Sequence, residues 1–315
     1  MEKMNRDIGC WQKEGVVMIK RTWLLALVLL TLTGCHSAYA ETAAAESKTE
    51  MRNTAVAQES ETQIGDYVTE GTESYRDFVV DSVLHSDEVG DIHYCVSIPD
   101  EYDGSEAYSL YITLPGYQGL YFQGAAMNIR TEEFAFEAQK YHDNMIVLAP
   151  QLEDWGETSA RKTIVLTEYF LNRYNIDREQ VYISGYSGGG ETLSLVLDSR
   201  PELYTAALMC SSQWDGGYGA VVKARIPLYF VIGESDEYYG SDPFHRAYQE
   251  IRRLYEEEGL SEPEIDALAV LDVKPAAYFT DSGVTNQHGG GGRLFSRDRD
   301  IMGWLFGEHK NLPIK

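Results

Sequence analysis

The chain has few basic residues and few cysteines, and it has no apolar run long enough to cross a membrane. Its 26 Lys and Arg residues face 50 Asp and Glu residues, so the formal net charge is -24. Such a surface repels phosphate backbones, which argues against nucleic acid as a partner. It also has no attraction for anionic lipid headgroups. The contents of 43% hydrophobic and 12% aromatic residues are those of a globular protein rather than a disordered one.

The longest apolar run lies near the N-terminus, between Trp23 and Leu32, and follows the basic pair Lys20-Arg21. It is about ten residues long, whereas a spanning helix needs about 20. A basic start, a short apolar run and a small-residue exit predict a secretory signal over residues 1–34. Residues 1–17 contain acids and have no signal character, which favours Met18 over Met1 as the true start.

The signal ends in Leu32-Thr33-Gly34-Cys35, which resembles a bacterial lipobox. It predicts cleavage before Cys35 and lipidation of that thiol, so that an extracytoplasmic protein is held at the bacterial membrane by acyl chains alone. The alternative is an ordinary signal peptide with a chance cysteine. Residues 35–66 are rich in Ala, Glu, Thr and Ser and predict a flexible tether, followed by a catalytic domain over residues 67–315.

Two cysteines remain in the predicted domain, Cys95 and Cys210. Each lies in an apparent strand, so buried free thiols are expected, and a disulfide between them stays open.

Short apolar, β-rich runs alternate with longer helical patterns along this domain. Several runs are continuous, as expected for strands covered on both faces. The order predicts an α/β fold with a mostly parallel, twisted sheet, helices on both faces and ligand chemistry at the carboxyl ends of the strands. The expected strands are Ile92–Ile98, Ser109–Leu114, Met145–Ala149, Val181–Gly185, Ala206–Cys210, Leu228–Gly233 and Ala277–Thr280, and the expected helices are Arg130–Tyr141, Ala160–Tyr174, Gly189–Asp198, Pro243–Glu258 and Asp298–Phe306.

A Gly-x-Ser-x-Gly pattern around Ser187 marks the candidate nucleophile. An apolar strand pattern precedes Gly185, and a helical pattern follows Gly189. A nucleophile elbow needs this context, because the sharp turn exposes the serine hydroxyl and the glycines remove Cβ atoms that would clash. The start of the helix supplies free N–H groups, which makes the backbone N–H of Gly188 an oxyanion donor. The alternatives are a plain glycine-rich turn and a phosphate loop, for which no Gly-Lys-Ser/Thr follows.

The stretch from Ile176 to Gly190 resembles the nucleophile region of prolyl-oligopeptidase-like and polyhydroxybutyrate-depolymerase-like esterases. The resemblance covers roughly Tyr94 to Phe306 and is most specific around Ser187. It implies an α/β-hydrolase fold, a Ser-Asp-His triad in that chain order, no metal and no organic cofactor.

The base should follow the acid, near the C-terminus. Of the seven histidines, His245, His288 and His309 lie after Ser187. His288 is favoured because it sits in a glycine-rich segment, interpreted as a loop between the last strand and the last helix. His245 lies in a charged helical run, and His309 lies in the tail.

The acid should follow the strand that ends at Gly233. The sequence continues Glu234-Ser235-Asp236, and resembling hydrolases have Gly-x-x-Asp here, which selects Asp236 to hold the histidine tautomer. Glu234 remains the alternative.

A second oxyanion donor is expected in the loop after an early strand. Pro115-Gly116-Tyr117 fits this place, with the backbone N–H of Tyr117 as donor; relatives often have His where Pro115 stands. A plain Pro-Gly turn is the alternative. Two aromatic segments that follow strands are candidates for substrate binding or for ordinary packing, and they contain Trp155 and the pair Gln213-Trp214.

Three functions fit this sequence. The first is an esterase acting on a small-molecule or polysaccharide-linked ester; the second is a peptidase with the same chemistry; the third is a non-catalytic binding module on a hydrolase scaffold. All three triad members are present in order, which favours an enzyme. The sequence encodes neither the substrate nor the oligomeric state.

Overall fold

The computed structural model describes residues 65–117 and 123–307. The predicted signal over residues 1–34, Cys35 and almost all of the predicted tether lie outside these ranges, as does His309. Within them, no helix has the length and apolar character needed to cross a membrane.

The strands form one ten-stranded mixed sheet in the order β1-β3-β4-β6-β5-β7-β8-β9-β10, with β2 also paired to β3. Strands β5 to β10 are parallel to their neighbours among themselves, while β1 to β4 pair antiparallel, and β4 joins the parallel part through β6. In chain order the strands are β1 (Tyr67–Thr69), β2 (Glu73–Tyr75), β3 (Phe78–Ser86), β4 (Gly90–Ser97), β5 (Tyr108–Leu114), β6 (Met145–Pro150), β7 (Ile176–Tyr186), β8 (Ala206–Cys210), β9 (Leu228–Gly233) and β10 (Ala269–Lys274).

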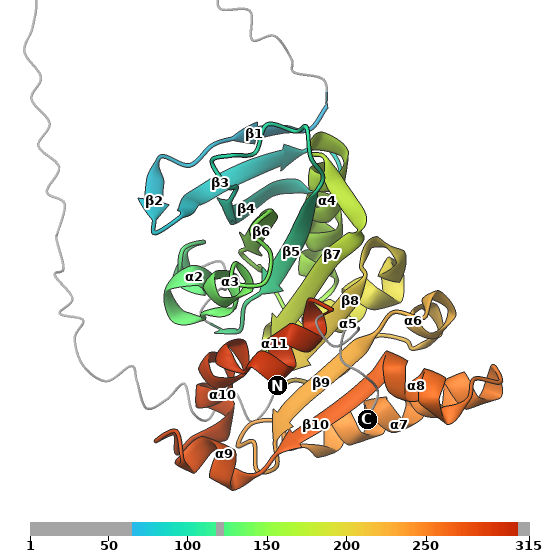
Figure 1. The fold of residues 1–315 in the computed structure, drawn as a ribbon. Helices are drawn as coiled ribbons and strands as arrows, with labels where there is room; N and C mark the ends of the chain where they lie inside the picture. The colour runs from blue at the N-terminus through green and yellow to red at the C-terminus, as the bar shows by residue number, and fades with distance from the viewer. Residues whose placement is uncertain (1–64, 118–122, 308–315) are drawn as a thin grey trace, which may run out of the picture. The chain divides into compact units, whose positions relative to one another are not determined.

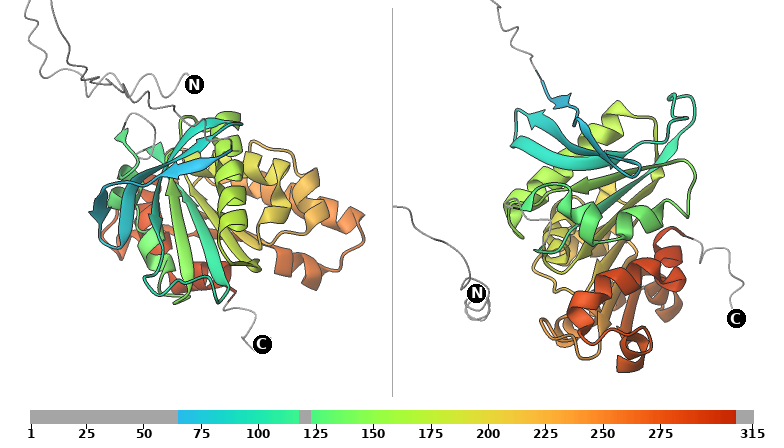
Figure 2. Two further views of the ribbon diagram at one scale, coloured as in Figure 1. Left: turned by 90° about the horizontal axis from the view of Figure 1, so that it is seen from above. Right: turned by 90° about the vertical axis from the view of Figure 1, so that its left-hand side faces the viewer.

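Helices cover both faces of this sheet, as Figure 1 and the view from above in Figure 2 show. The helices are α2 (Met127–Thr131), α3 (Phe134–Ala138), α4 (Glu157–Arg173), α5 (Gly188–Ser199), α6 (Gly219–Ala224), α7 (Asp242–Glu257), α8 (Glu262–Leu268), α9 (Ala276–Thr280), α10 (Gln287–Arg297) and α11 (Arg299–Leu305), with a 3-10 turn, η4, at Pro201–Leu203.

Side chains that alternate along the central strands enter two separate cores. On β5, Leu110 and Ile112 pack with α4 to α8, whereas Tyr111 packs with α3 and α11 on the other face. All seven residues of β5 are buried. Burial on both faces explains why the sequence of this strand is a continuous apolar run, and the α/β fold with a mostly parallel core sheet is as predicted.

Three segments differ from the sequence prediction. Ala277–Thr280, predicted as a strand, is helix α9, and the last strand is β10 instead. A short apolar run such as Ala-Tyr-Phe-Thr does not by itself distinguish a helix from a strand. The predicted helix Arg130–Tyr141 is two short helices, α2 and α3, which are separated at Glu132 by an extended residue. The segment containing His288, predicted as a loop, is helix α10.

Candidate active site

Ser187 occupies a sharp turn between β7 and α5. Its backbone has φ 52° and ψ −125°, a region that non-glycine residues rarely adopt. The end of β8 and the segment that follows it hold this turn: Ser187 N donates to the carbonyl of Cys210 (2.9 Å), and Ser212 Oγ donates to the carbonyl of Ser187 (2.6 Å). The strained backbone is thereby fixed on both sides, and the side chain projects at the carboxyl end of the parallel sheet.

The hydroxyl of Ser187 meets the imidazole of His288. Ser187 Oγ lies 3.0 Å from His288 Nε2, although the two residues are 101 positions apart in the chain. His288 belongs to the first turn of α10, so the loop assigned to it from sequence is wrong. Four consecutive glycines, usually poor helix formers, continue this helix because α10 packs closely on its neighbours: a Cβ at Gly292 would lie 3.2 Å from the ring of Tyr186.

Acidic and amide side chains anchor the start of α10. Glu237 accepts hydrogen bonds from the backbone N–H groups of Gln287 (3.0 Å) and His288 (2.9 Å). The side chain of Asn286 caps the helix by accepting from the N–H of Gly289. These bonds satisfy donors that a helix start leaves free, and they set the position of the imidazole.

Asp236 completes the hydrogen-bonded series. Its Oδ2 lies 3.0 Å from His288 Nδ1, and its Oδ1 accepts from the amides of Tyr238 (3.0 Å) and Tyr239 (2.9 Å). The side chain is fully buried. Burial opposes its charge, but the hydrogen bonds from His288 and the two amides outweigh burial, so the pKa of Asp236 is lowered. An ionised Asp236 can orient the ring and stabilise an imidazolium.

Glu234 and His245, the alternative acid and base, make other contacts. The carboxylate of Glu234 accepts from the backbone N–H of Ala276 (2.8 Å) and makes no described bond to His288. His245 lies within α7 and makes no described contact with Ser187 or Asp236. The structure therefore brings together Ser187, His288 and Asp236.

Tyrosines surround the imidazole. Tyr186 and Tyr238 both stack on the His288 ring, with centroid distances of 5.9 and 5.2 Å. The hydroxyl of Tyr186 also donates to the carbonyl of His288. Tyr239 donates its hydroxyl to Glu191 Oε1 (2.6 Å), which lies one helical turn after Ser187. The ring contacts restrict the rotation of the histidine.

The predicted oxyanion loop packs directly on the nucleophile turn. A Cβ at Gly189 would collide with the carbonyl oxygens of Leu114 and Pro115, and one at Gly116 would lie 3.4 Å from Ser187 Cβ. Residues 115–117 therefore lie beside the start of α5, where Gly188 supplies a backbone N–H. Donation by the Tyr117 and Gly188 amides to a substrate oxygen stays a prediction, because no ligand is present.

The three residues suggested for substrate binding differ in their surroundings. Trp155 covers Gly188, since a Cβ there would overlap its indole ring, and the ring of Tyr117 meets Trp155 edge-on at 6.3 Å. Trp214 stacks on Tyr218 and donates its indole N–H to the carbonyl of Gly216 (2.8 Å), and Gln213 bonds to Asp215 (3.0 Å). Trp155 therefore lies at the site, whereas the described contacts of Trp214 and Gln213 are structural.

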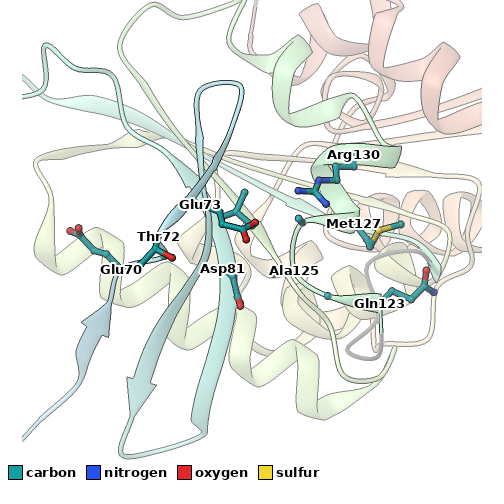
Figure 3. A pocket seen from close by; sticks show the side chains of 12 residues that line it. Glu70, Thr72, Glu73, Asp81, Gln123, Ala125, Met127 and Arg130 are labelled. Atoms are coloured by element: carbon teal, nitrogen blue, oxygen red, sulfur yellow. The ribbon is translucent and has the colours of Figure 1, made fainter.

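No group of three or more His, Cys, Asp or Glu side chains in residues 65–117 and 123–307 could hold a metal ion. Cys95 and Cys210 are free and buried, and burial raises the pKa of Cys95 to about 11. A cavity of about 430 Å³ between β2, β3 and α2 contains none of the triad residues and is lined partly by Glu73, Asp81 and Arg130 (Figure 3).

Comparisons with known proteins agree with this arrangement. Residues 150–215, which include Ser187, match the profile of the prolyl oligopeptidase family. No curated protein matches the chain. Among solved structures, a thermostable esterase has 21% sequence identity and a TM-score of 0.61 over 74% of this chain. This chain spans 63% of the length of that esterase.

Two further solved structures are more distant. Oligopeptidase B from Leishmania major has 12% identity and a TM-score of 0.48. The match covers 78% of this chain and 37% of the oligopeptidase. Est1E from Butyrivibrio proteoclasticus has 12% identity and a TM-score of 0.46. The match covers 73% of this chain and 97% of Est1E. The likeness to the thermostable esterase shows that this chain has the α/β-hydrolase fold. Its nucleophile region is prolyl-oligopeptidase-like, as the resemblance in the sequence implied.

Sequence reasoning missed four residues that support this site: Ser212, Glu237, Glu132 and Tyr186. Tyr186 occupies the first variable position of the Gly-x-Ser-x-Gly pattern, and the other three belong to no motif. Glu237 stands next to the predicted acid and offered the only local signal, a second carboxylate in the same turn. The other three act through contacts that only the folded chain brings together.

Proposed function

We propose that the protein is a serine esterase that hydrolyses carboxylic esters through an acyl-enzyme. The observation that carries this proposal is the hydrogen-bonded series Ser187–His288–Asp236 at the turn between β7 and α5. A serine hydroxyl is a weak nucleophile until a base takes its proton, and here the base lies within hydrogen-bond distance and is itself oriented by a buried acid.

The reaction follows from this geometry. Ser187 Oγ attacks the ester carbonyl carbon while its proton passes to His288 Nε2, and the oxyanion forms toward the amides of Gly188 and Tyr117. The tetrahedral intermediate then expels the alkoxide, which takes the proton from the imidazolium and leaves as an alcohol. Water, deprotonated by His288, attacks the acyl-enzyme, and the second tetrahedral intermediate breaks its bond to Ser187 Oγ, which takes the proton back from the imidazolium as the acid leaves. Asp236 stays ionised throughout and stabilises each imidazolium.

Two observations bear on the bond that is cleaved. The structure with a TM-score of 0.61 is an esterase, which supports an ester substrate. The match of residues 150–215 to the prolyl oligopeptidase family favours a peptidase as the second candidate. The excess of acidic residues suits a neutral substrate, either a small molecule or an ester on a polysaccharide, and disfavours nucleic acid. The motif at Cys35 supports a lipid-anchored, extracytoplasmic location.

A paired substrate series separates these candidates. We expect p-nitrophenyl esters of short and long acyl chains, together with acetylated and feruloylated sugars, to be hydrolysed with a higher kcat/KM than the matching p-nitroanilides and peptides. Ser187→Ala should abolish turnover, while Ser105→Ala, at an exposed serine outside the site, should retain it. A preference for amides would establish the peptidase. If the wild-type protein neither hydrolyses any of these substrates nor reacts with a fluorophosphonate, the non-catalytic binding module becomes the favoured function.

A further inference from the structure

Glu132 is a buried acid that the mechanism above does not use. It stands at the end of α2 and is only 5% exposed. Its Oε1 accepts a hydrogen bond from the backbone N–H of Gly116 (2.8 Å). Its Oε2 is buried and has no hydrogen-bond partner among the described residues. A carboxyl group in such surroundings is expensive to bury and requires an explanation.

The carboxyl lies directly behind the oxyanion loop. A Cβ at Gly116 would lie 3.3 Å from Glu132 Oε1, 3.2 Å from the ring of Tyr186 and 3.4 Å from Ser187 Cβ. Gly116 is therefore enclosed between the carboxyl and the nucleophile turn. Because peptide units are planar, fixing the Gly116 N–H fixes the orientation of the Pro115–Gly116 peptide. That restraint limits the orientation of the next amide, Tyr117 N–H, which is the predicted oxyanion donor.

No cation compensates a charge on Glu132 within the described part of the chain. The titratable groups that face it are Tyr111 on β5, Tyr186 on β7 and Cys210 on β8, and burial raises the pKa of all three. Tyr186 in turn bonds the carbonyl of His288 on α10. The neighbouring Glu133 is paired with Arg297 (2.6 Å), so that guanidinium is engaged elsewhere.

The surroundings determine the charge of this group. Burial raises the pKa of Glu132 to about 8, against the lowering effect of the Gly116 hydrogen bond. At neutral pH the carboxyl is therefore protonated, with Oε2 available for the proton and Oε1 still accepting from Gly116. Ionisation would place a negative charge behind the loop in front of which the oxyanion forms, and like charges at short range in a buried site repel strongly.

We propose that Glu132 is a positioning residue that holds the oxyanion loop through Gly116 in its neutral form, and that its ionisation lowers catalysis at alkaline pH. This inference rests on the proposed esterase function. It adds a residue from α2, outside the triad, and gives the enzyme an upper pH limit that the triad does not supply.

Three variants test it: Glu132→Gln, Glu132→Leu and, as a matched control, Glu133→Gln at the adjacent half-buried position, which makes no described contact with the oxyanion loop. Glutamine stays neutral and can still accept from Gly116, whereas leucine fills similar space without an acceptor. For each variant, kcat and KM for one p-nitrophenyl ester are measured from pH 6 to 10, corrected for spontaneous hydrolysis. The rate of labelling by a fluorophosphonate, which also places an oxygen in the oxyanion hole, is followed in parallel, and folding is checked by circular dichroism.

In the wild type and Glu133→Gln, we expect kcat to fall above about pH 8. Glu132→Gln should keep kcat within about threefold of wild type at pH 7 and lose the alkaline fall. Glu132→Leu should lose about 10- to 100-fold in kcat with little change in KM, since a displaced oxyanion donor acts on the transition state. An alkaline fall that persists in Glu132→Gln, or a folded Glu132→Leu with wild-type kcat, overturns the proposal while leaving the esterase intact. If Glu132→Leu does not fold, the Glu132→Gln profile decides. A wild type that neither labels nor turns over contradicts both proposals.

Discussion

Two glycine runs deliver the reacting side chains, and they are held in different ways. Gly188–Gly190 follows Ser187 at the start of α5, and Gly289–Gly292 follows His288 at the start of α10. In the first run Gly189 meets backbone, the carbonyls of Leu114 and Pro115, while Gly188 and Gly190 meet the side chains of Trp155 and Ser212. The second packs mainly against side chains, such as Tyr186 beside Gly292.

The anchoring bonds differ in the same way. Ser187 is held through its own backbone by Cys210 and Ser212, in a strained conformation. The helix that carries His288 is held by the side chains of Glu237 and Asn286. The backbone of the nucleophile is thus held by strand β8 and by the side chain of Ser212, whereas the side chains of Glu237 and Asn286 hold the start of the helix that carries the base. Outside the triad itself, we therefore expect changes to the supports of α10 to have graded effects and changes to the packing of the nucleophile turn to have severe ones.

Among variants that fold, the largest loss of kcat is expected at the acid of the triad. Asp236→Asn should lower kcat by about 10⁴-fold, because an amide favours the wrong imidazole tautomer. Glu234→Gln is the matched control in the same turn and should change kcat by less than about threefold, since the described hydrogen bond of the Glu234 carboxylate comes from the amide of Ala276 and not from the triad. Steady-state kinetics on one ester measure both variants. Equal losses would mean that the base is not oriented by Asp236 alone.

The glycine runs themselves give the next largest difference. Gly189→Ala should abolish soluble, active protein, because neither the β5 loop nor the elbow can move away from a Cβ without losing the site. Gly292→Ala should fold and retain at least about a tenth of the activity, since only the Tyr186 ring must shift by a few tenths of an ångström. Expression, thermal melts and kcat/KM compare the two. A normally active Gly189→Ala variant would remove the distinction between the runs.

A smaller, graded effect is expected at Glu237. Glu237→Ala removes the acceptor for two amides at the start of α10 and should lower kcat by roughly 10-fold, with a small fall in Tm. Glu237→Gln, which retains one acceptor oxygen, should restore part of the activity. Kinetics and melting curves measured on the same samples separate positioning from stability. Full activity in the alanine variant would show that other contacts set the imidazole.

The last prediction concerns stability rather than activity, and it acts on Glu132, which supports the oxyanion loop through Gly116. The pKa of Glu132 is raised to about 8 in the folded protein and returns to roughly 4.3 when the chain unfolds. Between these values the native state binds more protons, so its free energy of unfolding falls as pH rises. Glu132→Gln removes this loss and should gain stability relative to wild type between pH 5 and pH 8.5. Urea unfolding at the two pH values measures the gain; a difference between the proteins that does not change with pH would contradict it.

The sequence predicted most where the signal was local. Val181 and Ile183 before Ser187, and the helical pattern after it, reproduce the strand–turn–helix of the elbow. His288 was selected by chain order, although its glycine-rich surroundings were misread as a loop, because close packing on Tyr186 outweighs the low helix propensity of glycine. The antiparallel strands β1 to β3 went unnoticed, since they are short or only partly buried. Glu132 could not be distinguished among 50 acids, because its role depends on Gly116, 16 positions earlier.

The central claim is that Ser187 is the nucleophile and His288 its base, and peptide mapping of a covalent adduct tests it most directly. After reaction with a fluorophosphonate, mass spectrometry of the digested protein should find the phosphonyl group on Ser187. The adduct should be absent in Ser187→Ala and form far more slowly in His288→Ala. An adduct on another residue, or labelling of Ser187 at the wild-type rate without His288, would contradict the account.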